Sequence, residues 1–264
     1  MTTTTTAGRA VAGKRARITA ITSGKGGVGK TFLSANLAAA LARQGEKVLV
    51  LDADLGLANL DVILNLAAKF TLHDVFTGRA TLDEALWPAP GGFTVLLAGS
   101  GLIEYSRLTP ELRERLLEVI AQVRDRFDDV IVDTGAGISD VVLFTVSLAD
   151  EVLLIATPEP TSLADAYATV KVLVATQPPR PMRLLVNQAQ HPGDGRGVRD
   201  QLQRVIDRFV NPTLAAPITL DLIGAVPLDA DVREIIQRRR LLLDALPGSA
   251  AAQALIDAAA KLAP

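Results

Sequence analysis

The chain contains no cysteine and only two histidines in its 264 residues. The absence of cysteine excludes a disulfide framework and thiol chemistry, which fits a cytoplasmic protein. The histidines, His73 and His191, are isolated in the sequence, so they match no metal-ligand spacing and support no Ser-His-Asp arrangement. A histidine-based metal site or a serine-hydrolase triad is therefore not expected.

Long apolar runs and an excess of one charge are also missing. No run reaches the roughly 20 residues of a membrane-spanning helix, and the N-terminus lacks the apolar core of a signal peptide. The formal net charge is -2, so the overall charge gives no argument for nucleic acid or a membrane surface. We expect a soluble, cytoplasmic protein whose partners are indicated only by local features.

The first 16 residues differ in composition from the rest of the chain. They read MTTTTTAGRAVAGKRA, with threonines, basic residues and almost nothing to bury. Because such a segment cannot offset the entropy cost of ordering, we predict a disordered basic tail over residues 1–16. Two interpretations of the tail stay open: a solvated terminus, or a tether for an acidic surface.

The remaining residues, 17–264, read as a single α/β domain. Helical patterns lie between most of its apolar, strand-like runs, as the crossovers of a parallel sheet require. These runs cover residues 47–54, 93–100, 129–135, 151–158, 182–188 and 222–229. The predicted fold class is a doubly wound, mostly parallel sheet with helices on both faces.

The segment SGKGGVGKTF at residues 23–32 carries the clearest motif. From Gly24 to Thr31 it matches the G-x-x-x-x-G-K-[ST] pattern of a phosphate-binding P-loop. The run ARITAITS before it predicts a buried strand, and TFLSANLAAALARQG after it predicts a helix that stops at Gly45. Strand, loop and helix N-terminus together direct backbone N–H groups at an anion. A glycine-rich turn that binds nothing is the alternative.

The same loop has a second lysine, Lys25. Lys30 already supplies the charge that reaches the β and γ phosphates, so Lys25 is spare within one subunit. It is either a solvated surface lysine or a charge that reaches a nucleotide bound by a second copy of the chain.

Aspartates lie at the carboxyl ends of two predicted strands. Asp52 and Asp54 alternate along the strand end in LDADLGLANLD, and Asp133 ends the strand in DDVIVDTGAGISD. Because open α/β folds bind ligands at this edge of the sheet, we expect these carboxylates near a metal-bound triphosphate. Taken singly, each segment could be a solvated turn or an ordinary strand end.

Together these segments resemble the MinD/ParA family of deviant Walker A ATPases. KGGVGKT resembles the family's phosphate loop, residues 51–61 its first switch, and residues 128–140 its Walker B element and second switch. The resemblance implies an ATPase that uses Mg²⁺, binds ATP and ADP, and forms a homodimer when ATP is bound. It also implies that Lys25 crosses the dimer interface to the other subunit's phosphates.

The resemblance assigns roles to individual residues of this chain. Lys25, Lys30 and Asp54 are the expected catalytic residues, with the lysines on the phosphates and Asp54 orienting the attacking water. The expected Mg²⁺ residues are Thr31, Asp52 and Asp133.

Nucleotide contacts are expected from the loop and from two later segments. The loop residues are Gly26, Gly27, Val28, Gly29, Lys30, Thr31 and Phe32. The two later segments are LLVNQ, with Asn187, and GAVPLD, with Pro227 and Asp229. In the family these segments form the adenine pocket, so the resemblance implies that these three residues contact the adenine base. Phe32 stands where a second threonine is common, so a hydroxyl near the α phosphate is missing and we expect modestly weaker nucleotide binding.

Within the family, the chain is similar to the FlhG/FleN type, which sets flagellar number and placement in bacteria. The stretch EPTSLADAYA at residues 159–168 carries much of this resemblance. Its plain structural interpretation is a strand-to-helix loop with Thr161 or Ser162 as N-cap. The resemblance implies flagellar assembly or regulatory proteins as partners, and recruitment to a cell pole or weakly to the inner membrane.

A ParA-like partitioning ATPase that binds DNA non-specifically as an ATP dimer is the alternative. RGVRDQLQRVIDRF and QRRR supply arginines for it. Asp200 and Asp207 interrupt the first cluster, and mixed charge on a helix is typical of a solvated face. DNA is therefore not the expected partner.

The C-terminal segment, residues 249–264, bears on membrane binding. Many relatives end in a basic amphipathic helix, whereas SAAAQALIDAAAKLAP is rich in alanine, with one lysine and no aromatic residue. Its apolar face is too small for strong interfacial binding, so we expect a packing helix and weak or absent membrane association.

Overall fold

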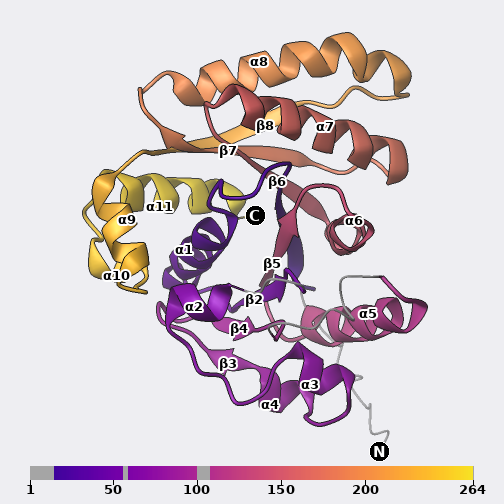
Figure 1. Cartoon of the computed structure of the whole chain (residues 1–264), viewed down its shortest axis with the longest axis vertical. Coiled ribbons are helices and arrows are strands. Elements are labelled where there is room, and N and C mark those ends of the chain that lie inside the picture. The colour runs from indigo at the N-terminus through magenta and orange to yellow at the C-terminus, as the bar shows by residue number, and fades with distance from the viewer. Residues whose placement is uncertain (1–14, 56–58, 100–107, 264) are drawn as a thin grey trace, which may run out of the picture.

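The computed structural model describes residues 15–55, 59–99 and 108–263. Their strands form an eight-stranded sheet with the order β3-β4-β2-β5-β1-β6-β7-β8 (Figure 1). The strands are β1 (Arg17–Ser23), β2 (Val48–Ala53), β3 (Trp87–Pro88), β4 (Thr94–Leu96), β5 (Asp129–Ala136), β6 (Glu151–Ala156), β7 (Met182–Ala189) and β8 (Leu220–Pro227). Neighbouring strands are parallel except for β3 and β4, which pair antiparallel at one edge.

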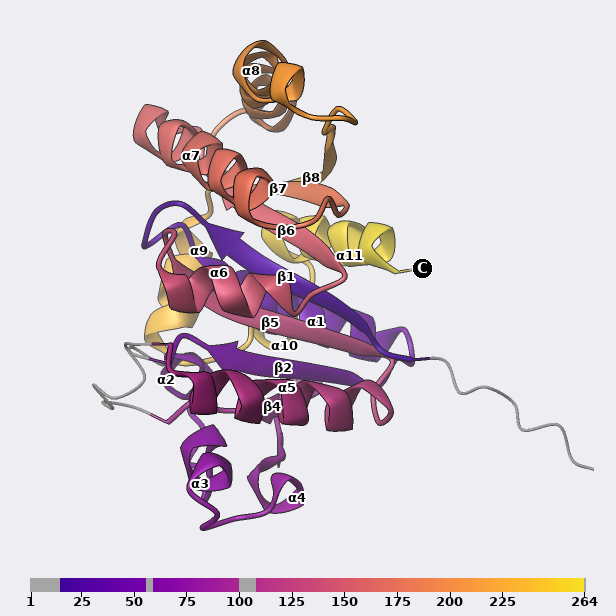
Figure 2. The same cartoon turned by 90° about the vertical axis from the view of Figure 1, so that its right-hand side faces the viewer.

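Helices cover both faces of the sheet, which confirms the predicted doubly wound fold class (Figures 1 and 2). The helices are α1 (Lys30–Arg43), α2 (Leu60–Leu64), α3 (Leu72–Phe76), α4 (Leu82–Ala85), α5 (Pro110–Arg124), α6 (Asp140–Ser147), α7 (Pro160–Thr176), α8 (Asp194–Phe209), the short 3₁₀ helix η2 (Asn211–Thr213), α9 (Ala230–Gln237), α10 (Leu242–Ala245) and α11 (Ala250–Leu262). Residues of α1, α2, α9, α10 and α11 share one apolar core, and those of α3 to α8 share the other.

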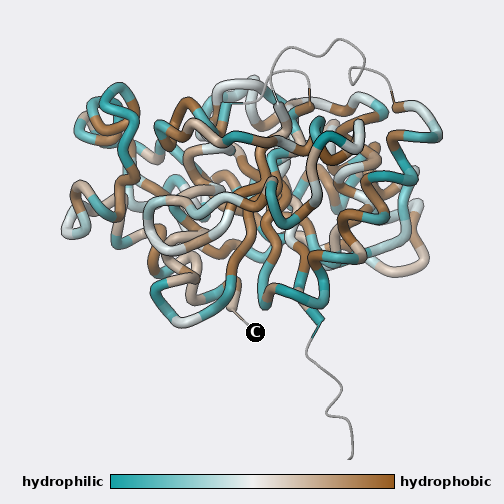
Figure 3. The backbone as a smooth tube through the Cα atoms, turned by 90° about the horizontal axis from the view of Figure 1, so that it is seen from below, coloured by the Kyte–Doolittle hydropathy of each residue, from teal (hydrophilic) through white to brown (hydrophobic). Residues whose placement is uncertain are grey.

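The two cores follow from the alternation of side chains along each strand. In β2, Leu49 and Leu51 belong to the core under α3 to α8, whereas Val48 and Val50 belong to the core under α1 and α11. A strand buried on both faces is apolar without interruption, which is why the strand-like runs were recognisable in the sequence. Figure 3 shows these hydrophobic segments in the interior and hydrophilic segments mainly at the periphery.

Helix α1 is the central helix of its layer. Its residues are buried almost continuously from Lys30 to Leu41. Gly29 precedes the helix in the left-handed conformation, with φ 94°, and Gly45, with φ 96°, follows its end. Both the start at the P-loop and the predicted stop near Gly45 are therefore confirmed.

The predicted tail lies outside the described residues except for its last two positions. Arg15 is exposed, whereas Ala16 is buried and its backbone N–H donates to the Arg124 carbonyl at 2.8 Å. The folded part of the chain therefore includes Ala16, which the sequence prediction had placed in the tail, because its side chain belongs to the apolar core under α3 to α8.

Helix α11 is a packing helix, as predicted. Its buried face consists of Ala251, Ala252, Leu255, Ala258, Ala259 and Leu262. This face lies against α1 and β8, where small methyl groups allow the helices to approach closely. Among the described helices, none combines the length and apolar character needed to cross a bilayer.

Candidate functional site

The loop between β1 and α1 is shaped by close backbone approaches. A Cβ atom on Gly24 would lie 2.2 Å from the Asp165 carbonyl oxygen, so α7 packs directly on the loop. Gly29 has φ 94°, a conformation that residues with a side chain rarely adopt. A Cβ on Gly26 or Gly27 would meet nothing within 4 Å. The middle of the loop therefore faces open space.

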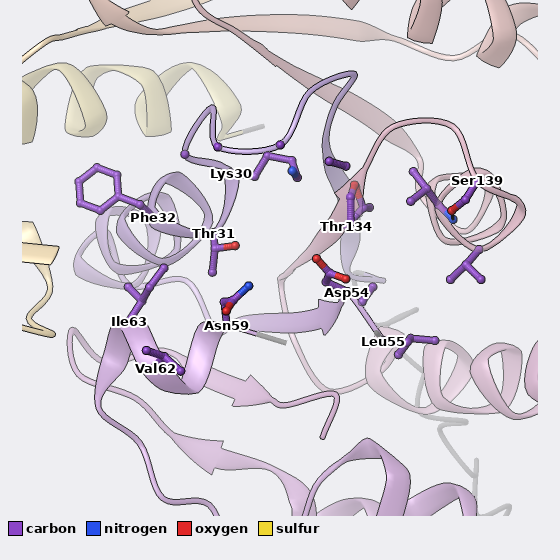
Figure 4. Close-up of a pocket in the computed structure, with 18 of the residues that line it drawn as sticks. Lys30, Thr31, Phe32, Asp54, Leu55, Asn59, Val62, Ile63, Thr134 and Ser139 are labelled. Atoms are coloured by element: carbon purple, nitrogen blue, oxygen red, sulfur yellow. Dashed lines mark hydrogen bonds between the residues drawn. The ribbon is translucent and has the colours of Figure 1, made fainter. Parts of the chain in front are cut away.

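That open space is a cavity of about 730 Å³ at the carboxyl edge of the sheet. It is lined by Gly26, Gly27, Gly29, Lys30, Thr31, Phe32, Ala53, Asp54, Leu55, Asn59, Val62, Ile63, Thr134, Gly135, Ala136, Ser139, Val141, Val142 and Ile236. Figure 4 shows the polar ends of Lys30, Thr31 and Asp54 directed toward the same space. The position beside the central strands is where doubly wound folds bind ligands, and the volume suits one small molecule.

Lys30 is buried at the cavity wall. Its exposure is 9%, although lysine is almost never buried without a counter-charge. Burial lowers the pKa of Lys30, and the nearby Asp133 and Asp54 carboxylates raise it. A cationic group held at this depth, at the N-terminus of α1, favours an anion in the cavity.

Asp52 and Asp133 form a buried carboxylate pair on neighbouring strands. They face each other in the β2–β5 register, and each is 1% exposed. Burial raises the pKa of Asp133 to about 6, against the opposing effects of the Thr31 and Ser34 hydroxyls and Lys30. Burial and then the charge of Asp133 raise the pKa of Asp52 well above its ordinary value. Both carboxylates would be stabilised in their ionised form by a cation.

A magnesium ion that is bound together with phosphate fits these residues. The Asp52 Oδ1 accepts the Asp54 backbone N–H at 3.1 Å, whereas no hydrogen-bond partner for Oδ2 lies within the described residues. In this part of the chain no group of three or more His, Cys, Asp or Glu could hold a metal ion by itself. Mg²⁺ often needs only one or two carboxylates, because substrate phosphates and waters complete its coordination.

Lys25 lies outside the cavity lining. Its Nζ donates to Glu159 Oε2 at 2.8 Å and to Thr161 Oγ1 at 3.1 Å, at the start of α7. The Lys25 side chain is 39% exposed, so it lies on the surface beside the loop. Lys25 therefore lies apart from Lys30. This is the position expected of a lysine that the cavity of its own subunit does not need.

The N-cap predicted for α7 is wrong. The helix begins at Pro160, and Glu159 occupies the N-cap position without a side-chain cap. The Ser162 hydroxyl accepts the Thr157 backbone N–H at 3.0 Å, and Thr161 instead accepts from Lys25. With Pro160 at the first helical position, the helix starts two residues earlier than capping by Thr161 would place it, and three earlier than capping by Ser162.

The three residues predicted at the base are not part of the cavity lining. Asn187 lies within β7 rather than beyond it, and its Nδ2 donates to the Val28 carbonyl at 2.8 Å. Pro227 ends β8, and Asp229 caps α9 by accepting the Asp231 backbone N–H at 2.9 Å. The structure therefore brings Asn187 against the phosphate loop and gives Asp229 a capping contact.

Several cavity residues were missed from the sequence. Among them, Val62, Ile63 and Ile236 join the predicted Phe32 in giving one part of the lining an apolar character, and Thr134 and Ser139 add hydroxyls elsewhere. These missed residues come from three separate segments, so no motif joins them. Ser34, whose hydroxyl bonds to Asp133, could have been found, because it lies one helical turn after Lys30 on the same helix.

The fold and the cavity define a P-loop nucleotide-binding protein. Residues 19–242 match the family described as the CobQ/CobB/MinD/ParA nucleotide binding domain, and the chain belongs to that family. It is 42% identical over 246 residues to the antiactivator FleN of Pseudomonas aeruginosa, covering 93% of this chain and 86% of the relative. It is 32% identical to the flagellum site-determining protein YlxH of Helicobacter pylori, covering 89% of this chain and 78% of that one.

A solved structure shows the same architecture. The septum site-determining protein MinD of Pyrococcus horikoshii, complexed with Mg-ADP, aligns with a TM-score of 0.75 and 28% identity. The alignment covers 94% of this chain and 96% of that chain. The predicted family and fold are therefore confirmed.

Proposed function

We propose that this chain is a Mg²⁺-dependent ATPase switch that dimerises on binding ATP, hydrolyses it slowly, and regulates the number or placement of bacterial flagella. The observation that carries the proposal is the division of the two lysines: Lys30 is buried in the cavity, and Lys25 lies outside it on the surface. One subunit therefore has a complete phosphate site and a further cation to offer to another subunit. The flagellar role rests on the similarity to FleN and YlxH.

Each polar residue at the cavity has a distinct task in this proposal. Lys30 and the loop N–H groups bind the phosphates, and Asp54 orients the attacking water. Thr31, Asp52 and Asp133 would hold Mg²⁺, which when bound neutralises charge on the phosphate oxygens. This assignment explains why two carboxylates are buried side by side in a site that otherwise favours anions.

The adenine pocket remains a proposal for Asn187, Pro227 and Asp229. The Asn187 Nδ2 is already committed to the Val28 carbonyl, so its Oδ1 is the atom left for the exocyclic amino group of adenine. Replacing Asn187 with leucine should weaken ATP binding and reduce the preference for ATP over GTP. Unchanged base preference would remove this residue from the pocket.

The dimer is tested with a variant that cannot hydrolyse its nucleotide. Asp54→Ala should bind ATP, lose hydrolysis and form dimers with ATP and Mg²⁺ but not with ADP, as measured by light scattering. The matched control is the double variant Lys25→Ala, Asp54→Ala, which should bind ATP and stay monomeric. An ATP-bound Asp54→Ala monomer at high concentration would overturn the proposal.

The cellular role requires a separate test. Deleting the gene in its own bacterium should change flagellar number or position, and the wild-type gene, but not Lys30→Ala, should restore both. A fluorescent fusion then reports whether the protein gathers at a pole or at the inner membrane. Normal flagella after deletion would contradict the flagellar part of the proposal while leaving the ATPase part intact.

DNA binding is the competing function. The arginines that would support it are partly paired: Arg199 lies 2.8 Å from Asp200, and Arg238 pairs with Glu234. Non-specific DNA binding would appear with ATP at low salt and fall steeply as salt is added. We expect no such binding.

A further inference from the structure

Ser34 hydrogen-bonds to one of the two buried carboxylates beside the cavity. Its Oγ donates to Asp133 Oδ1 at 2.9 Å, with Ser34 at 0% and Asp133 at 1% exposure. Ser34 lies on α1, three residues after Thr31, so the two hydroxyls share one face of the helix. The bond links the helix that follows the phosphate loop to Asp133 within β5.

Three other helical hydroxyls are bonded differently. Thr145 donates to the Val142 carbonyl, Thr169 to the Asp165 carbonyl and Thr176 to the Val172 carbonyl, each within its own helix. Such backbone bonds are the usual way for a serine or threonine to be satisfied inside a helix. The Ser34 hydroxyl instead donates to an ionisable side chain of another element, and this contact needs a hydroxyl at this helical position.

Ser34 and Thr31 both act on Asp133, but they differ in their access to the cavity. The Thr31 hydroxyl also lowers the pKa of Asp133, and Thr31 lines the cavity, where a ligand can compete for it. Ser34 is fully buried and not part of the lining. When a ligand engages Thr31, Ser34 is the donor that stays in place on the carboxylate.

We propose that Ser34 is a positioning residue that fixes the Asp133 carboxylate for Mg²⁺. This inference rests on the proposed function, because it requires that Asp133 serve a nucleotide-bound metal ion. Residues that orient a metal-binding group through a hydrogen bond commonly contribute strongly to metal affinity. Ser34 therefore affects the affinity for Mg²⁺, and not the binding of phosphate by the loop.

The test separates metal affinity from nucleotide affinity. Binding of a fluorescent ADP analogue is measured without Mg²⁺ and then across a Mg²⁺ titration. Ser34→Ala should bind the analogue without Mg²⁺ within about twofold of wild type, and should need about 10- to 100-fold more Mg²⁺ for the half-maximal effect. Ser34→Thr, which keeps the hydroxyl, should restore the wild-type requirement.

The matched control is Thr145→Ala, which also deletes a buried hydroxyl but one bonded within α6. It should leave the Mg²⁺ requirement unchanged. If Ser34→Ala does not fold, the same titration is carried out with Ser34→Cys. This variant keeps the size of the side chain and weakens the hydrogen-bond donor. A folded variant with the wild-type Mg²⁺ requirement would overturn the role of Ser34 alone, whereas a wild type whose ADP binding ignores Mg²⁺ would overturn the proposed function with it.

Discussion

Lys25 Nζ lies 2.8 Å from Glu159 Oε2, so the lysine proposed to serve another subunit is paired within its own chain. To reach a second nucleotide, Lys25 must leave this carboxylate and the Thr161 hydroxyl. The pair is solvent-exposed, at 39% for Lys25 and 59% for Glu159. Exposed ion pairs contribute roughly 0 to 1 kcal/mol, so this contact can bias dimerisation but cannot prevent it.

Glu159→Gln should therefore lower the protein concentration at which the ATP-bound chain is half dimeric, by up to about 30-fold, because each symmetric dimer breaks two such pairs. Sedimentation with ATP and Mg²⁺ in the hydrolysis-deficient Asp54→Ala background measures this concentration. Thr161→Val, which removes the longer contact, should have a smaller effect in the same direction. Weaker dimerisation of Glu159→Gln would show instead that Glu159 contributes directly to the dimer.

Replacing each of the two loop lysines should have a different effect on nucleotide binding. Lys30→Ala removes a buried charge from the phosphates and should weaken ATP and ADP binding about 10- to 100-fold, the effect of losing one charged hydrogen bond. Lys25→Ala should bind both nucleotides as wild type does. Equilibrium binding of fluorescent analogues checks both variants, and an equal loss in the two would contradict the division of roles.

The nucleotide-free chain should become more stable relative to Asp133→Asn as the pH falls. The Asp133 carboxyl has an ordinary pKa of 3.8 in the unfolded chain and a pKa of about 6 in the fold, because of burial. Ionisation of Asp133 therefore opposes folding above pH about 6, by up to about 3 kcal/mol, and this cost disappears as the pH falls toward 4. The advantage of Asp133→Asn in urea unfolding should be largest at neutral pH. A stability advantage of Asp133→Asn over the wild type that increases as the pH falls would contradict this prediction.

Membrane attachment should be weak because two of the three large apolar side chains of α11 are buried and the third, Ile256, is half-buried. Leu255 is 0% and Leu262 1% exposed, so neither can enter a lipid surface while the helix stays packed. We expect little co-sedimentation with anionic vesicles at physiological salt with ADP, and only weak binding of the ATP dimer. Lys261→Glu should change neither result. Strong ATP-dependent pelleting that Lys261→Glu abolishes would show that α11 binds lipid.

The sequence predicted the parts of the site that lie close together along the chain. The loop around Lys30, its strand and its helix form one continuous segment, and buried parallel strands leave uninterrupted apolar runs that place Asp52 and Asp133. Glu159 was not predicted as the counter-ion of Lys25, since 134 residues separate them and only the folded sheet brings α7 beside the loop.

The adenine residues show the limit of motif matching. Asn187 and Asp229 lie near the expected ends of β7 and β8, but motif position does not reveal which neighbour each side chain bonds. In the fold, Asn187 meets the Val28 carbonyl and Asp229 caps a helix. Such choices are decided by local competition between hydrogen-bond partners, which a sequence pattern does not record.

The enclosure of α1 on nearly all sides also limits how this protein can vary. An α-helix on a protein surface normally offers a face where substitutions are neutral, as the exposed side of α8 does. Helix α1 has almost no such face between Lys30 and Leu41, and its alanines set how closely the sheet and α11 approach. Changes in this helix would require matching changes in its neighbours, so divergence among related chains should accumulate in α8 long before it reaches α1.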